Sequence, residues 1–217
     1  SPCEGYTVNF RFVTQIATGD SSRVSDQQTT TYEDAKGKTF SFVTKSFIDQ
    51  ALDKEVKGTA TRKDKGVEVD LDKPEKKIIQ LAPTQFPTQH LEELIGKAEK
   101  GEHFYETNLF DGSEDADRVM TTSIVVGKKA EVDKNDPELP ALAKLGKDKY
   151  WPVDIAYFDL SQKESGEEVP QYRISFKLHE NGLTRDLTMD YGEFSMTGKL
   201  VNLALFDSAP KKACNNK

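Results

Sequence analysis

The sequence predicts a mainly β fold in which an antiparallel sheet encloses or cups an apolar interior and one helix accompanies it. Three observations predict this. Several runs of β-branched and aromatic residues alternate with polar ones, a single long segment has helical spacing, and an Asn-Gly pair joins two alternating runs. About a dozen strands with one helix are compatible with a closed barrel and with a long sheet that curls over a central helix, and both alternatives stay open here.

The first element expected is one long, half-buried strand near the N-terminus. Its residues alternate with a period of two, which places successive side chains on opposite faces of a sheet. One face carries Tyr6, Val8, Phe10, Phe12 and Ile16, and the other carries Thr7, Asn9, Arg11 and Gln15.

Further strands are expected wherever the same alternation returns. It returns over residues 39–48, 67–71 and 172–178, and Asn181-Gly182 then predicts a tight hairpin turn with positive φ at the glycine. The returning strand covers residues 183–190. A last run, from Glu193 to Phe206, changes parity after Leu200, which indicates a bulge or burial on both faces.

One helix is predicted with clear boundaries. Pro87 and Thr88 form a start signal and Gly101 an end signal. Between them lies an apolar stripe at helical spacing, formed by Leu91, Leu94, Ile95 and Ala98. A second short helix is expected around residues 140–145, between the Asp136-Pro137 breaker and Gly146.

The composition and charge of the chain limit the classes of function that fit the sequence. The chain has 217 residues, 35% hydrophobic and 31% charged, with a net charge of −7, and we expect one domain over residues 1–217. The acidic balance argues against nucleic acid, whose phosphates need a Lys/Arg surplus. No apolar stretch reaches the roughly 20 residues of a membrane span. Because the chain opens on the polar Ser1-Pro2-Cys3, we expect that an export signal has been removed.

The two cysteines, Cys3 and Cys214, lie at opposite ends of the chain. A pair placed just outside the first and last periodic segments suits a disulfide that joins the termini in an oxidising compartment. Two unrelated free thiols are the alternative. A metal site is not expected, because no CxxC or HxxxH spacing accompanies them.

The residues predict no catalytic constellation, metal or cofactor. His90, His103 and His179 are dispersed, which is typical of surface histidines, and the chain lacks a nucleophile elbow, a P-loop and a dinucleotide loop. The acidic run 111–117 is interpreted as a turn, since the EF-hand spacing is missing. Core packing is the default interpretation of the large apolar side chains, but some are candidates for lining a cavity or docking a partner: Phe86, Leu91, Leu94, Ile95, Trp151 and Tyr157.

An ordered set of short motifs spans nearly the whole chain. The motifs are Cys3-Glu4-Gly5-Tyr6, the run Leu81-Ala82-Pro83-Thr84-Gln85-Phe86-Pro87-Thr88-Gln89-His90, Phe110-Asp111-Gly112-Ser113, Trp151-Pro152-Val153-Asp154-Ile155-Ala156-Tyr157-Phe158, Glu180-Asn181-Gly182, Asp190-Tyr191-Gly192-Glu193-Phe194 and the closing Cys214. Together they resemble the EipB-like family of periplasmic cell-envelope integrity proteins. The resemblance implies a β-spiral or half-barrel around one central helix, similar in shape to the lipoprotein carriers LolA and LolB. It also implies localisation in the periplasm of a Gram-negative bacterium, a Cys3–Cys214 disulfide and no catalytic residues.

Two hypotheses of function follow. The first is a non-enzymatic protein that maintains the envelope by binding another periplasmic or envelope protein, and a tetratricopeptide-repeat protein is one partner that the resemblance implies. The second is a carrier of lipid or lipoprotein acyl chains, since a curled sheet with inward apolar side chains can leave an apolar hollow. A hydrolase is a distant third, because the residue groupings it needs are absent.

Overall fold

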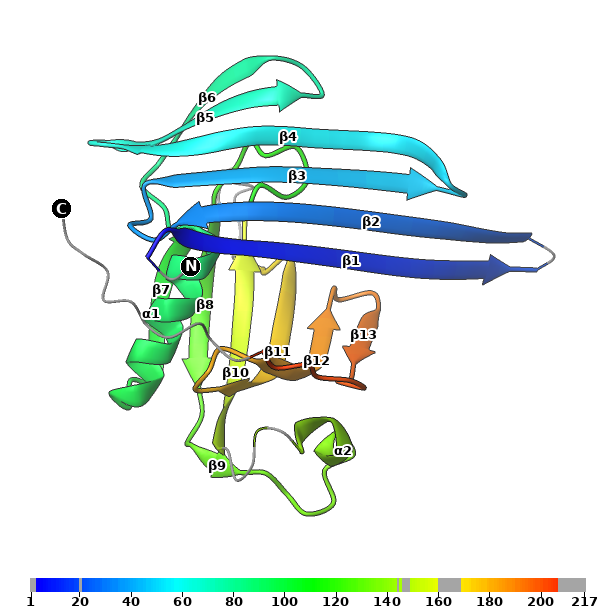
Figure 1. Ribbon diagram of the computed structural model, residues 1–217, viewed down its shortest axis with the longest axis vertical. Coiled ribbons are helices and arrows are strands. Elements are labelled where there is room, and N and C mark those ends of the chain that lie inside the picture. Colours follow the sequence, from blue (N-terminus) through cyan, green and yellow to red (C-terminus); the bar gives the residue numbers. More distant parts are fainter. Residues whose placement is uncertain (1–2, 20, 144, 146–148, 160–168, 207–217) are drawn as a thin grey trace. The chain divides into compact units, whose positions relative to one another are not determined.

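Antiparallel strands dominate the computed structural model, which describes residues 3–19, 21–143, 145, 149–159 and 169–206 (Figure 1). The strands form two open sheets, one with six strands and one with seven. The prediction of a mainly β, antiparallel fold with few helices is confirmed. Strand pairing stops between β6 (Lys77–Leu81) and β7 (Phe104–Leu109), where the chain forms a helix. The strands therefore form two sheets and not the one long sheet that was expected.

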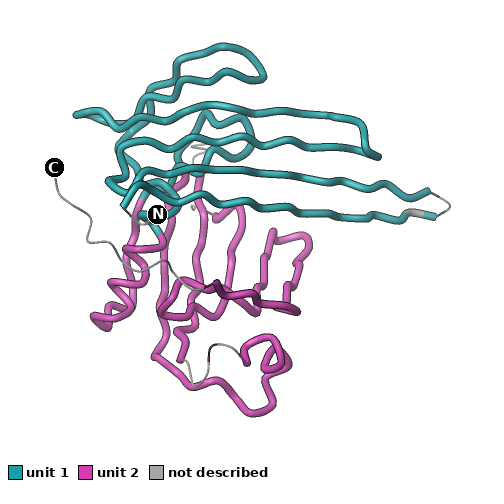
Figure 2. Tube along the Cα trace, viewed as in Figure 1, with its two compact units in different colours: residues 1–90, 108–119 teal, residues 91–107, 120–217 magenta. Residues whose placement is uncertain are grey.

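The chain divides into two compact units (Figure 2). The first comprises Ser1–His90 and Asn108–Val119, and the second comprises Leu91–Thr107 and Met120–Lys217. One helix and one strand run across the boundary between these ranges. A single domain over residues 1–217 therefore stays a prediction, and each unit is described by itself below.

The sheet of the first unit is a meander in which every strand pairs with its neighbour in sequence. Each hairpin is short, so each strand is paired by the residues that follow it directly. The six strands are β1 (Gly5–Thr18), β2 (Ser21–Asp34), β3 (Thr39–Ile48), β4 (Ala51–Lys63), β5 (Gly66–Lys73) and β6 (Lys77–Leu81).

The core of this unit lies on one face of β3, β4 and β5. Phe40 stacks on Phe86 at 5.4 Å between ring centroids and meets the edge of Phe110 at 6.2 Å. The alternation of these strands puts the rest of the core on the same face. Its further buried members are Phe42, Val56, Ala60, Val67, Val69, Leu71 and Ala116.

The apolar face of β1 is exposed, although the sequence predicted a half-buried strand. Val8, Phe10 and Ile16 keep 52%, 55% and 62% of their surface in contact with solvent. Two facts explain the difference. Within the described ranges β1 is an edge strand that pairs with β2 alone, and the β2 residues opposite Val8 and Phe10 are the small, polar Thr31 and Thr29.

The helix α1 (Pro87–Glu99) begins at the predicted proline. The buried carboxylate of Glu33 on β2 accepts hydrogen bonds from the backbone N–H groups of Thr88 at 2.7 Å and Gln89 at 3.2 Å. A carboxylate at this end satisfies donors that have no partner within the helix and complements its positive pole. The predicted helix is confirmed, and its start is attached to the sheet of the first unit.

The second sheet has the order β13-β12-β11-β10-β8-β7, with β9 paired to β10. Gly182 has a φ of +86° in the turn between β11 and β12, as its place after Asn181 predicted. The elements are β7 (Phe104–Leu109), β8 (Met120–Val126), β9 (Ala130–Glu131), the short helix α2 (Leu139–Leu142), β10 (Lys149–Phe158), β11 (Tyr172–His179), β12 (Thr184–Asp190) and β13 (Ser195–Gly198).

The predicted strand from Glu193 to Phe206 is wrong in extent. Only Ser195–Gly198 pairs with β12, and residues 199–206 have no regular structure. Val201 and Phe206 are almost fully exposed, so the apolar character of this run does not reflect burial in the structure. The change of parity in the pattern marks the place where pairing ends rather than a bulge.

A buried ionic cluster lies in the second unit around Arg185 on β12. Its guanidinium donates to Asp136 at 2.9 Å, to Glu138 at 2.6 Å and to the ring of His179 at 2.9 Å. Glu138 also accepts the backbone N–H of Leu200 at 2.6 Å. The interpretation of His179 as a surface residue is therefore wrong, because its ring is fully buried as an acceptor for the arginine.

Two predictions stay outside what this structure describes. Cys3 precedes β1, but Cys214 lies outside the described residues, so the disulfide between them stays a prediction. The finer shape, a spiral around α1, also stays a prediction.

Candidate binding pocket

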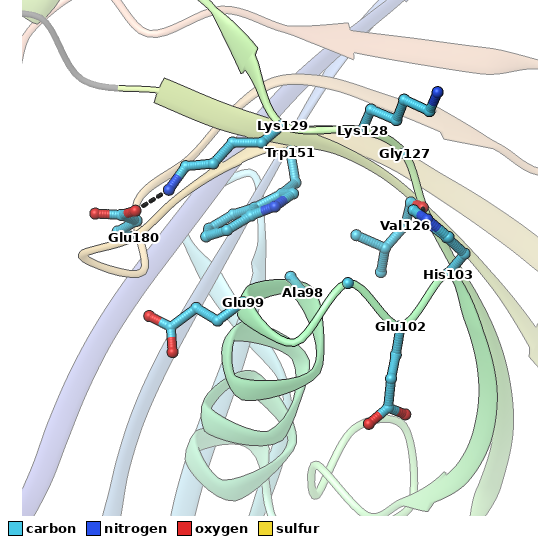
Figure 3. A pocket seen from close by; sticks show the side chains of 11 residues that line it. Ala98, Glu99, Glu102, His103, Val126, Gly127, Lys128, Lys129, Trp151 and Glu180 are labelled. Atoms are coloured by element: carbon cyan, nitrogen blue, oxygen red, sulfur yellow. Dashed lines mark hydrogen bonds and ion pairs between the residues drawn. The ribbon is translucent and has the colours of Figure 1, made fainter.

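A pocket of about 440 Å³ opens in the second unit beside the C-terminal end of α1 (Figure 3). Residues from five segments line it: the last turn of α1, the connection to β7, the end of β8 with the turn that follows, β10, and the β11–β12 turn. The lining residues are Ala98, Glu99, Gly101, Glu102, His103, Val126, Gly127, Lys128, Lys129, Trp151 and Glu180.

The end of α1 shapes one wall. Gly101 has a φ of +76°, the left-handed conformation that favours glycine after a helix. The N–H of Glu102 donates to the carbonyl of Lys97 at 3.0 Å and that of Gly101 to Ala98 at 3.1 Å, which is the bonding of a Schellman motif. The motif stops the helix and turns the chain, so that Glu102 and His103 reach the pocket.

The floor of the pocket is apolar. Trp151 is only 4% exposed, and Val126 and Ala98 are buried beside it. Trp151 lies on β10 and pairs with the buried Leu178 of β11, so its backbone position is fixed within the sheet. Because so little of the indole is exposed, it forms a rigid apolar base that a group entering the pocket can contact only over a small area.

The rim carries charges of both signs. The Lys129 ammonium lies 4.4 Å above the Trp151 ring centroid and forms an ion pair with Glu180, drawn as a dashed line in Figure 3. On the other side, Lys97 donates to Glu102 at 2.7 Å, and this hydrogen bond raises the pKa of Lys97. Such a rim suits an amphipathic group with a charged or polar end.

His103 is the imidazole among the residues that line the pocket. His103 Nδ1 is 2.9 Å from the carbonyl oxygen of Val126, a partner that fixes the ring instead of activating a nucleophile. Across the described ranges, no three His, Cys, Asp or Glu side chains come together in a way that could hold a metal ion. The pocket can hold a ligand group between an indole and paired charges.

The structure places the predicted site residues in several different environments. Trp151 forms the pocket floor, and Leu94 is buried on α1 one turn before Ala98. Leu91 and Ile95 lie against the turn at Gly182, where a Cβ on the glycine would be within 4 Å of both side chains.

Tyr157, at the other end of β10, stacks on Tyr172 at 4.5 Å. Phe86 belongs to the core of the first unit. Of the six predicted residues only Trp151 lines the pocket, and a docking role for any of them stays a prediction.

Sequence reasoning missed the charged rim. The pattern around Lys128 and Lys129 is that of a solvated turn, and Glu180 stands out only as part of a hairpin motif. The signal that could have found them is position. Lys128 and Lys129 follow the apolar end of β8 and Glu180 directly follows β11, and loops at strand ends are where binding residues are often found.

Comparison with known proteins identifies the family. The family model described as EipB-like matches residues 1–207. The chain belongs to the EipB-like family. A curated relative, the cell envelope integrity protein EipB of Brucella abortus (strain 2308), is 56% identical over 213 residues, which cover 98% of this chain and 75% of the relative.

A solved relative of this EipB-like chain agrees with its fold. It is a crystal structure described as a β-barrel-like protein of a domain of unknown function, DUF1849, from Brucella abortus. It matches with a TM-score of 0.89 and 55% identity, over 95% of this chain and 84% of the relative. In the part of the chain that the structure describes, neither helix has the length and apolarity needed to cross a membrane.

Proposed function

We propose that this EipB-like chain is a non-enzymatic periplasmic protein of a Gram-negative bacterium that maintains the cell envelope by binding another envelope protein at the Trp151 pocket. The observation that carries the proposal is the combination of an apolar indole floor with a rim of paired charges. The name of the Brucella relative supports the role in envelope integrity. A β-spiral around α1 is part of the same proposal and is supported by the family resemblance.

The pocket size indicates what kind of group it takes. A volume of about 440 Å³ is in the range of small ligand sites and suits one or two large side chains of a partner. A partner side chain with an apolar stem and a charged end can contact the exposed edge of Trp151 and pair with Glu180 or Lys129. A tetratricopeptide-repeat protein is the partner that the family resemblance implies, and repeat proteins offer extended binding surfaces to their partners.

The test combines site-specific photo-crosslinking with a charge reversal. A photoreactive residue replaces Lys128 on the rim or, as a matched control, the exposed Lys57 on β4. We expect one defined adduct from the rim in periplasm, and at least a fivefold loss of it when Lys129→Glu sets a like charge beside Glu180. Identical adducts from both positions, or an adduct insensitive to Lys129→Glu, would contradict binding at the pocket.

One observation favours a second candidate, a carrier of acyl chains. The apolar stripe of β1 is exposed on the same sheet face as the core of the first unit, as a surface for fatty chains would be. Mass spectrometry of an organic extract from natively purified protein distinguishes the candidates. A stoichiometric acyl species supports the carrier, and a blank supports partner binding.

A further inference from the structure

The outer edge of β1 has the properties of a strand that pairs with another strand. β1 is 14 residues long and runs in continuous register with β2. Among the described residues, its backbone hydrogen bonds go to β2 alone. The strands at the other sheet ends are much shorter, with 5 residues in β6, 6 in β7 and 4 in β13.

Natural sheets protect long edges with proline, lysine or a bulge, because free N–H and C=O groups recruit other strands. β1 contains none of these between Gly5 and Thr18, and Arg11 is its one charged side chain. Arg11 is already paired with Asp26 on β2 at 2.9 Å. An edge of this length without protection is expected to have a partner.

The ladder shows which backbone groups face outward. The N–H of Ala35 donates to the carbonyl of Glu4 at 3.0 Å, so Glu4 and Ala35 form a hydrogen-bonded pair. Because bonded and non-bonded positions alternate in an antiparallel ladder, the even-numbered residues of β1 bond to β2. The odd-numbered residues, including Arg11 and Val13, direct their N–H and C=O groups away from the sheet.

We propose that this edge pairs antiparallel with β1 of a second copy, with Phe12 on the two-fold axis. The register sets Val8 opposite Ile16, Phe10 opposite Thr14 and Arg11 opposite Val13. Residues Arg11 and Val13 exchange backbone hydrogen bonds across the edge, and the two Phe12 rings meet at a non-hydrogen-bonded pair, where side chains lie closest.

The two nearest registers with the axis shifted towards Arg11 are less favourable. An axis between Arg11 and Phe12 sets each Phe12 against an arginine and joins the apolar face of one copy to the polar face of the other. An axis at Arg11 sets two guanidinium groups directly opposite each other, which is repulsive. With the axis at Phe12 no like charges oppose, and the Arg11–Asp26 pair is kept in each copy.

The occupant is a second copy because the edge is self-complementary. When the strand is reversed about Phe12, Val8 lies opposite Ile16 and Phe12 lies opposite itself, with Thr14 opposite Phe10, and Val8, Phe10 and Ile16 are all exposed. A contact in which each copy offers the same patch closes on itself as a dimer. It joins two six-stranded sheets into one and leaves neither β1 edge open.

A cysteine placed on the axis tests the register. Phe12→Cys sets two thiols opposite each other, and mild oxidation should give covalent dimers on a non-reducing gel. Phe10→Cys is the matched control on the same face, because its two thiols lie four residues apart along the strands, about 13 Å. Covalent dimer from Phe12→Cys at several times the yield of Phe10→Cys supports the proposal, whereas equal yields or no dimer from either would overturn it.

Sedimentation velocity tests the edge without new thiols. The unaltered chain should shift from monomer to dimer as its concentration rises. Val13→Pro removes an outward N–H but no bond to β2, so it should leave the circular dichroism spectrum unchanged and abolish the shift. An unaltered chain that stays monomeric throughout, or a Val13→Pro chain that dimerises equally well, would refute pairing at β1.

Discussion

Asp136 shows how single residues set the stability of the second unit. Its carboxylate accepts hydrogen bonds from the N–H of Glu138, from Lys177 at 3.0 Å and from Arg185 at 2.9 Å. Burial by itself opposes ionisation, but these hydrogen bonds and the charge of Arg185 outweigh it and lower the pKa of Asp136 to about 2. The ionised carboxylate is therefore part of the native structure.

Asp136 predicts a defined acid sensitivity. A carboxyl whose pKa is lowered by folding stabilises the native state above its unfolded pKa of about 4, and this contribution is lost as the pH falls from about 4 towards 2. Asp136→Asn should lower the free energy of unfolding at pH 7 by roughly 2 kcal/mol and reduce its dependence on pH in that window. Urea unfolding as a function of pH measures both. The exposed Asp72→Asn is the control and should change stability by less than about 0.5 kcal/mol.

Arg185 shows why a buried charge can escape prediction from the sequence. Its odd number is in phase with Leu187 and Met189, but a register shift in the β11–β12 ladder reverses that phase, since Arg185 pairs with Lys177 and Met189 with Ile174. Its burial therefore does not follow from parity, and its partners could not be predicted either. Asp136 and Glu138 come from a loop far away in sequence, and only the three-dimensional fold brings them to β12.

At the scale of elements, the start of α1 depends on a side chain from another element. Glu33 reaches from β2 to the first free N–H groups of the helix. Glu33→Ala should lower the free energy of unfolding by about 1 to 3 kcal/mol, because buried donors lose their acceptor. Glu33→Gln keeps an acceptor oxygen but loses the charge, and its effect should be smaller.

Thermal and urea unfolding of both variants measure this contribution. Glu68→Ala, which removes an exposed carboxylate on β5, serves as the control. If Glu33→Ala and Glu68→Ala were equally stable, the carboxylate at the helix start would have no stabilising role.

Elements with strong periodicity were predicted correctly, and their environment was predicted less well. The helix boundaries followed from Pro87 and Gly101, and the hairpin followed from Asn181-Gly182. Alternation predicted β1 but not its exposure, because burial depends on which elements cover a face. The last run failed for the same reason, since apolar residues such as Val201 continue after pairing has ended.

At the scale of the whole molecule, the candidate pocket was beyond sequence reasoning. Of its lining residues, the sequence pattern indicates only Trp151, as an aromatic that suits a cavity rim. Lys129, Glu102 and Glu180 come from separate segments that meet because β8, β10 and the β11–β12 turn are neighbours in one sheet. Strand order carries this information, and composition and local patterning do not determine strand order.

The predicted disulfide acts on the whole chain. A bond between Cys3 and Cys214 closes nearly all of the sequence into one loop, which in the chain-entropy model stabilises by on the order of 5 kcal/mol. Cys214→Ser should therefore lower the melting temperature without abolishing the fold, since each unit keeps its own core. Calorimetry with and without reductant measures this, and equal melting temperatures for the unaltered chain in both conditions would contradict the bond.

The meander of the first sheet has a consequence for how the chain folds. Every pairing from β1 to β6 joins consecutive strands, so each requires closure of only a short loop and the sheet can form one hairpin after another. Its aromatic core is different, because Phe110 reaches Phe40 and Phe42 only after α1 and β7 have been made. The six strands thus acquire their hydrogen bonds early and their packing late, and in the interval the faces of Phe40 and Phe42 are open to water.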